Sequence, residues 1–191
     1  LDAVLTQADA DERYVMLASH HPLASLVNDI APPDAPRMLG PALADVLSDH
    51  ACVVLWLTGH THRTAVVPHG TWWEVTAPSL IDWPQQSRII ELMRGRGTLT
   101  VAVTMLDHAG EAPWAGGLDG IVDFAGLSRE LAANDWQTRV AALDDHPRAG
   151  GATERNVLLS VPDPCARGRR AGSRASRRRR DAAHWHLPLL H

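Results

Sequence analysis

The sequence predicts an α/β domain of buried strands with few helices, followed by a tail of different composition. The segment ACVVLWL, residues 51–57, is apolar on both faces, which is typical of a strand in the middle of an α/β sheet. Residues 38–50 place apolar side chains at helical spacing and predict an amphipathic helix, with Pro41 in its first turn. The apolar run at 12–19 predicts a second buried strand.

The other elements follow from local patterns in chain order. A proline-rich stretch with Asp and Asn predicts a loop after the first strand. Two segments predict antiparallel hairpins, because runs of β-branched residues flank turns that contain glycine. A helix and a final strand complete the domain. These elements are the loop at 24–37, the hairpins at 63–78 and 87–106, the helix at 126–134 and the strand at 155–161.

The composition divides the chain at Cys165. Residues 165–191 hold eight of the 18 basic residues, all of which are Arg, and one of the 22 acidic residues. Residues 1–164 therefore hold 10 Arg against 21 Asp and Glu, a net charge of −11. The Arg-rich stretch has no apolar periodicity and predicts disorder. We therefore expect a folded domain at 1–164 and a disordered tail at 165–191.

Several classes of protein are excluded or made less probable by composition. No run of 18 apolar residues is present, so no transmembrane helix is predicted. The two cysteines fit neither a CxxC zinc spacing nor a disulfide framework. The chain starts at Leu1 without a targeting segment, and we expect that an N-terminal part of the protein precedes it.

Histidines follow both predicted buried strands. His60 and His62 come after Gly59, and His20 and His21 end the earlier strand. Alternating side chains in extended backbone would place the first pair on one side, roughly 6–7 Å apart, and would let only one of the second pair face them. If the strands are parallel neighbours, the histidines meet at one sheet edge, where open α/β sheets place their sites.

Metal binding must be weighed against an ordinary polar loop. Scattering 11 histidines at random gives roughly 0.6 His-x-His pairs in a chain of this length, so the pair alone is weak evidence. A second such pair, at 184–186, lies in the tail and follows no strand. Asp82 and Asp107 end predicted strands and could approach a metal site, but Asp is also common in turns.

Taken together, the motifs resemble the C-terminal half of the calcineurin-like metallophosphoesterases. The resemblance rests on His-His-Pro at 20–22 after a strand, then a helix, then a strand that ends in Gly-His-Thr-His at 59–62. The later segments APSLIDWPQQSRIIEL, TMLDH, AAND and ERNVLL are similar to an actinobacterial sub-group of that superfamily. The resemblance covers residues 12 to about 162.

This resemblance implies a fold, an activity and a ligand set. The fold would be a partial sandwich of two mixed β-sheets flanked by helices, with metals at the sheet edge. His20 and His60 would bind one metal, His62 would bind the other, and His21 would be a neighbour. The enzyme would hydrolyse phosphoesters with two Fe, Mn or Zn ions and a bridging hydroxide that attacks phosphorus. Monoester, diester and nucleotide substrates all stay open, and the sub-group tends to carry a twin-arginine export signal.

The family's remaining ligands come from motifs that precede His-His-Pro. These are Asp-x-His, Gly-Asp-x-x-Asp and Gly-Asn-His-Asp/Glu, and we expect all of them to lie outside this chain. We therefore expect weak metal binding and little phosphoesterase activity from this chain alone. Two alternatives are a non-catalytic interaction domain and a nucleic-acid-binding protein that acts through the Arg-rich tail. Nucleic acid is disfavoured as a partner, because the tail has little aromatic interleaving and adjoins an acidic body.

Overall fold

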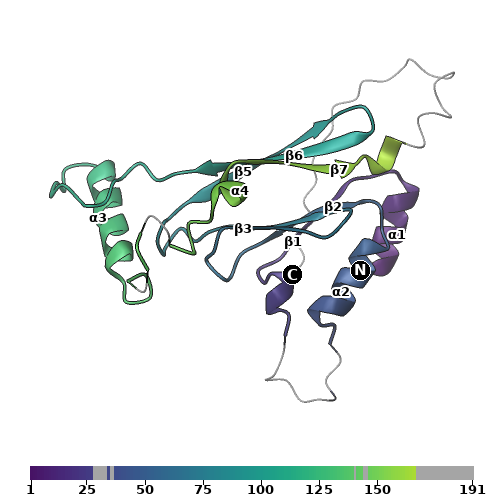
Figure 1. Ribbon diagram of the computed structural model, residues 1–191, viewed down its shortest axis with the longest axis horizontal. Helices are drawn as coiled ribbons and strands as arrows, with labels where there is room; N and C mark the ends of the chain where they lie inside the picture. Colours follow the sequence, from purple (N-terminus) through teal and green to yellow (C-terminus); the bar gives the residue numbers. More distant parts are fainter. Residues whose placement is uncertain (28–33, 35–36, 140, 144–145, 167–191) are drawn as a thin grey trace.

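The computed structural model describes residues 1–27, 34, 37–139, 141–143 and 146–166. In these residues two β-sheets stack face to face and helices flank them (Figure 1). The predicted α/β sandwich with flanking helices is therefore confirmed. Of the tail predicted to be disordered at 165–191, the first two residues instead form part of an ordered turn in which Cys165 is buried. Residues 167–191 lie outside the described residues, as does most of the loop predicted at 24–37.

The first sheet, sheet A, is mixed and has the strand order β1-β2-β4-β3. Its strands are β1 (Val15–Ala18), β2 (Val53–Thr58), β3 (Ala65–Pro68) and β4 (Trp73–Thr76). Strands β1, β2 and β4 run parallel, and β3 pairs antiparallel with β4. The two strands that precede the histidines are thus parallel neighbours, and the hairpin predicted at 63–78 is confirmed. The prediction that the first of them is buried is wrong, because β1 lies at the edge of the sheet and alternates half-buried with exposed side chains.

The second sheet, sheet B, is antiparallel and has the order β5-β6-β7. Strands β5 (Ser87–Arg94) and β6 (Thr98–Leu106) form the predicted hairpin, and β7 (Val157–Pro162) is the predicted final strand. Gly97 closes the hairpin turn with φ +83°, a backbone angle that only glycine adopts freely.

The helices confirm one prediction, lengthen a second and add two helices that the sequence analysis did not identify. Helix α2 (Gly40–Ser48) is the helix predicted at 38–50, with its proline in the first turn. Helix α3 (Ile121–Asn134) begins five residues earlier than predicted. Helices α1 (Asp2–Ala10) and α4 (Ala152–Arg155) were missed, because one has weak amphipathicity and the other is a single turn. Short 3-10 turns occupy Leu23–Ser25 and Pro164–Ala166.

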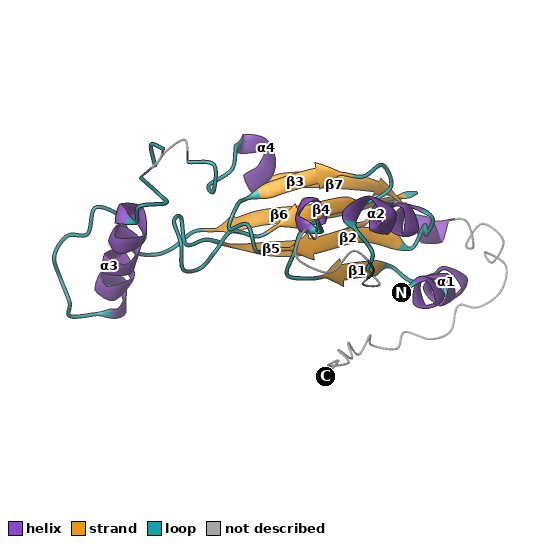
Figure 2. Cartoon of the chain, turned by 90° about the horizontal axis from the view of Figure 1, so that it is seen from below, coloured by secondary structure: helices purple, strands orange, loops and turns teal. Residues whose placement is uncertain are grey.

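Two apolar layers hold the domain together. One lies between the sheets and is formed by β-branched and leucine side chains. The other lies between sheet A and helices α1 and α2, on the opposite face of that sheet (Figures 1 and 2). Sheet A is therefore covered on both faces, which explains why β2 reads as a continuous apolar run. Every helix in the described ranges is too short or too polar to cross a membrane.

A histidine with two carboxylate partners holds α1 against the sheet. His50 is 7% exposed, and its ring lies 2.8 Å from Asp9 through Nδ1 and 3.1 Å from Asp2 through Nε2. Asp9 also accepts a hydrogen bond of 2.7 Å from the backbone N–H of Cys52, at the start of β2. The hydrogen bonds to Asp9 and then Asp2 raise the pKa of His50.

Stability should depend on the protonation of His50. A raised folded-state pKa stabilises the fold below the unfolded value of about 6.5, and this contribution is lost as pH rises through the folded value. The free energy of unfolding, measured with urea at a series of pH values, should therefore fall as the pH rises above about 6.5. His50→Gln should flatten this dependence, whereas His108→Gln, whose ring bonds the backbone of Gly110, should keep it. Parallel curves for the His50 variant and wild type would contradict the assignment.

Asp163 joins the two sheets at the opposite end from the histidines. Its buried side chain accepts hydrogen bonds of 2.8 Å from the Tyr14 hydroxyl, before β1, and from Arg94 Nε, at the end of β5. Burial opposes the charge, but the bonds from Tyr14 and Arg94 outweigh it and lower the pKa of Asp163.

Removing this buried carboxylate should destabilise the domain. Asp163→Ala leaves the Arg94 guanidinium without its ionic partner, and we expect a loss of about 3–5 kcal/mol in the free energy of unfolding. Asp11→Ala, which removes an exposed pair with Arg13, should cost less than about 1 kcal/mol. Denaturant titration measures both values, and equal losses would show that Asp163 does not clamp the sheets.

Candidate metal centre

Parallel pairing of β1 and β2 brings the two histidine motifs to one edge of sheet A. Ala18 lies opposite Leu57 in the register, and the Ser19 N–H donates to the Leu57 carbonyl at 3.0 Å. One step further along, the Gly59 N–H donates to the His20 carbonyl, also at 3.0 Å. The ladder thus continues past the strand ends and fixes the loop of His20 against the loop of His60.

Three imidazole rings converge at this point. His60 Nδ1 lies 3.2 Å from His20 Nε2, and the rings of His60 and His21 stack with centroids 3.9 Å apart. One ring nitrogen from each of the three histidines lies within 4.8 Å of the others. Within the described part of the chain, His20, His21 and His60 thus form a group of three side chains that could bind a metal ion.

His20 and His21 both face His60, although we expected that only one of them would. Strand β1 ends at Ala18, and His20 and His21 lie in a bend after it. The alternation of side chains applies to extended strands and does not hold in a bend. His21 therefore packs its ring against His60, and its Nδ1 atom is buried without a hydrogen-bond partner among the described atoms.

The backbone of His60 and His62 is not extended either. His60 has φ +64° and His62 has φ +54°, which are left-handed backbone angles that non-glycine residues seldom adopt. Thr61 between them donates its N–H to the Gly59 carbonyl at 2.7 Å and closes a tight turn. The expectation that His60 and His62 would point the same way is therefore wrong, and strained backbone of this kind clusters at functional sites.

His62 turns towards a carboxylate instead of joining the three rings. Its Nδ1 atom forms a hydrogen bond with Asp82 Oδ2, and Arg148 Nη1 lies 3.4 Å from the same oxygen. Of the two aspartates that could approach the site, Asp82 does so. Asp107 pairs with Arg129 at 3.0 Å instead. Arg148 had no sequence signal, because the segment before β7 has no regular pattern.

The sequence analysis also missed a buried carboxylate behind the histidines. Glu74 on β4 is 4% exposed, and its Oε1 atom accepts a 2.8 Å hydrogen bond from the Leu23 N–H, directly after His-His-Pro. Its Oε2 atom lies 3.2 Å from His69 Nε2. The sequence signal that could have identified Glu74 is its position as a charged residue inside an otherwise apolar strand. Glu74 anchors the loop that presents His20 and His21.

The surroundings of His60 favour its unprotonated ring. Desolvation by burial comes first, and repulsion from His21, His20 and His62 adds to it, so the pKa of His60 is lowered. Neutral imidazole is the form that binds transition metals. The donor chemistry therefore fits an ion such as Mn, Fe or Zn.

The described part of the cluster is rich in imidazole and poor in carboxylate. The 3.2 Å between His60 Nδ1 and His20 Nε2 fits two ligands of one ion, but no carboxylate belongs to this group in the described residues. An Asp-x-His triplet does stand at 144–146, after the histidine motifs. Its aspartates lie outside the described residues, and His146 is buried.

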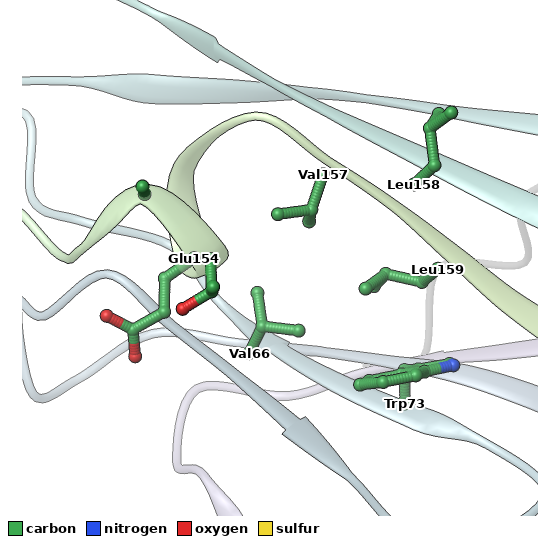
Figure 3. A pocket seen from close by; sticks show the side chains of 8 residues that line it. Val66, Trp73, Glu154, Val157, Leu158 and Leu159 are labelled. Carbon is green, nitrogen blue, oxygen red and sulfur yellow. The ribbon is translucent and has the colours of Figure 1, made fainter.

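A separate cavity of about 540 Å³ opens where the edges of the two sheets meet. Val66 and Trp73 from sheet A face Val157 and Leu159 from sheet B, and Glu154 of α4 lies at its rim (Figure 3). None of the candidate ligands lines this cavity. Its apolar lining offers no metal ligands apart from that one carboxylate, so it is distinct from the histidine cluster.

Two known proteins are similar to parts of this chain. No protein-family model matches this chain. It is 34% identical over 95 residues to a manganese-dependent ADP-ribose/CDP-alcohol diphosphatase of Xenopus tropicalis, a match that covers 49% of the chain and 27% of that protein. A solved dimetal phosphatase from Danio rerio shares 21% identity, with a TM-score of 0.39, over 56% of the chain and 35% of its own.

The curated relative confirms the predicted resemblance to the calcineurin-like metallophosphoesterases. The chain spans about a quarter of the length of that relative. The similarity to an actinobacterial sub-group stays a prediction.

Proposed function

We propose that this chain supplies the histidine side of a two-metal centre in a phosphoester hydrolase. The observation that carries the proposal is the 3.2 Å separation of His60 Nδ1 and His20 Nε2. Two nitrogens that each lie about 2.1 Å from one ion are about 3.0–3.4 Å apart, depending on the coordination geometry. The two rings therefore already stand at the spacing of ligands that share a metal.

The remaining histidines take different roles in this proposal. His62 lies in the same turn and would bind the second metal with the ring nitrogen that Asp82 leaves available. His21 stacks on His60 and would fix the orientation of that ring rather than bind the ion. The histidines come together because the parallel pairing of β1 with β2 places both histidine loops at one edge of sheet A.

The metals would supply charge neutralisation at the phosphoryl oxygens and activation of a water molecule. The protein would bind the metals through unprotonated imidazole nitrogens, on loops that backbone hydrogen bonds already hold together without metal. Manganese is our first choice among Fe, Mn and Zn, because the Xenopus tropicalis relative is described as manganese-dependent. Since that relative is also described as a diphosphatase, a diphosphate linkage is the substrate class that we would test first.

A second candidate function is a non-catalytic interaction domain. Helix α3 exposes several apolar side chains, with Ile121 85%, Phe124 55% and Leu131 64% exposed. An exposed apolar face of this kind marks interaction surfaces in other proteins. Absence of metal binding would favour this role. Nucleic-acid binding through the Arg-rich tail concerns residues outside the described part and stays a prediction.

Metal binding should depend on two of the three clustered histidines. We expect His20→Ala and His60→Ala to weaken Mn²⁺ or Zn²⁺ binding by at least 10-fold, because each removes a nitrogen ligand. His21→Phe keeps an aromatic ring against His60 and should retain most of the affinity. Isothermal titration calorimetry of the full 191-residue chain measures these values. Equal affinities for wild type and the His60 variant would remove the basis of the proposal.

The isolated chain should be a poor catalyst even with metal. The cluster has no carboxylate to bridge two ions among the described residues, and a two-metal mechanism needs both ions held close together. We expect little turnover of p-nitrophenyl phosphate or bis-p-nitrophenyl phosphate at saturating Mn²⁺, followed by nitrophenolate absorbance. Metal-dependent turnover that disappears in His60→Ala would show that the chain holds a complete centre.

A further inference from the structure

We infer that Asp82 is the positioning residue for His62 and that Arg148 holds Asp82 in place. The inference rests on the proposed metal centre and adds a residue outside the His-His-Pro and Gly-His-Thr-His motifs. It starts from the hydrogen bond between His62 Nδ1 and Asp82 Oδ2. A carboxylate on one ring nitrogen fixes the tautomer and leaves the other nitrogen with its lone pair available.

The ring of His62 needs such a partner. Its side chain is 42% exposed, so packing alone leaves it several orientations. Its backbone is left-handed, with φ +54°, and its neighbour His60 turns into the cluster of three rings. The hydrogen bond to Asp82 therefore determines where the Nε2 atom points, and that atom has no other assigned partner among the described contacts of this ring.

Asp82 is itself held by a short turn. Its backbone N–H donates to Ser79 Oγ at 3.1 Å, and its carbonyl accepts a 2.8 Å hydrogen bond from the Gln85 N–H. The Gln85 side chain in turn donates to Ser128 Oγ of helix α3 at 2.9 Å. The turn between β4 and β5 is thus fixed at both ends, and the carboxylate leaves it at a defined place.

Arg148 completes the arrangement from the opposite side. Its side chain is 13% exposed, and besides Asp82 it donates to Gln137 Oε1 at 2.9 Å and to Thr138 Oγ1 at 3.5 Å. Its carbonyl accepts a 3.0 Å hydrogen bond from the Thr64 N–H, two residues beyond His62. Arg148 therefore contacts both the carboxylate and the backbone of the histidine loop, and it links them to the segment after α3.

The positioning role differs from direct metal ligation in a measurable way. A residue that acts only through His62 should have no effect once His62 is gone, whereas an independent ligand should still contribute. The tautomer of His62 also responds to Asp82 without any metal. These two readouts separate the inference from a general loss of stability.

The experiment uses the full chain labelled with ¹⁵N and long-range ¹H–¹⁵N spectra of the histidine rings. Wild-type His62 should show a protonated Nδ1 and an unprotonated Nε2. Asp82→Ala should change this to a mixture of tautomers, and Asp82→Asn, which keeps an acceptor oxygen, should restore part of it. Asp107→Ala removes an aspartate that is also paired with an arginine and is the matched control, with no effect expected on His62.

The second arm titrates Zn²⁺ and follows the His62 ring signals. Zn²⁺ is the probe because imidazole sites bind it more tightly than Mn²⁺. We expect Asp82→Ala to weaken binding at His62 by about 10–100-fold, the usual effect of losing an outer-shell partner. Calorimetry on His62→Ala should show no further loss when Asp82→Ala is added.

The possible results distinguish failure of the proposed metal centre from failure of the positioning role of Asp82. Wild type that binds no Zn²⁺ or Mn²⁺ overturns the proposed function, and the tautomer measurement still tests the contact with Asp82. Wild type that binds metal while Asp82→Ala binds equally well, or loses affinity additively with His62→Ala, overturns the positioning role and leaves the metal centre intact. Should Asp82→Ala fail to fold, shown by circular dichroism, Asp82→Asn and Arg148→Gln carry the same comparison, with smaller expected losses.

Discussion

The parallel pairing of β1 with β2 is the interaction on which the candidate centre depends. The ladder continues beyond the strands through the Gly59 N–H and the His20 carbonyl, so the two loops cannot separate without breaking backbone hydrogen bonds. Burial of sheet A on both faces stabilises that pairing, because every strand carries apolar side chains into one layer or the other. His20 and His60 are exposed, and the strand β2 that precedes His60 is almost fully buried.

Three polar side chains around the centre come from three different segments of the chain, and each of them stabilises a loop. Glu74 holds the loop after β1, Asp82 holds His62, and Arg148 connects Asp82 to the segment after α3. A metal centre gains from this arrangement, since ligands that are oriented before the ion binds lose less conformational freedom. The same arrangement makes the centre sensitive to substitutions far from it in sequence.

Much of the fold was predictable from local pattern. The strands at β1 and β2, both hairpins and helix α2 follow from apolar runs and glycine turns, because burial imposes those patterns directly on the chain. Helix α1 was not predictable, since it buries only Leu5 and Ala8 and is held by His50 through Asp9 and Asp2. For the candidate site, His20, His60 and His62 stay predicted ligands, and their expected mutual orientation was wrong where the backbone leaves the extended region.

The sequence by itself determined where the strands lie and that histidines follow two of them, because apolar runs and glycine turns mark the strands directly. That β1 and β2 pair in parallel, and so bring the histidines to one edge, was decided by the tertiary structure. Only the tertiary structure decided that His21 stacks on His60, that His62 turns to Asp82, and that Arg148 joins them. Those choices depend on left-handed turns at His60 and His62 and on contacts between residues that lie 20 positions apart, for His62 and Asp82, or 66 positions apart, for Asp82 and Arg148. Local sequence carries no signal for such contacts, because they exist only once the two sheets have packed.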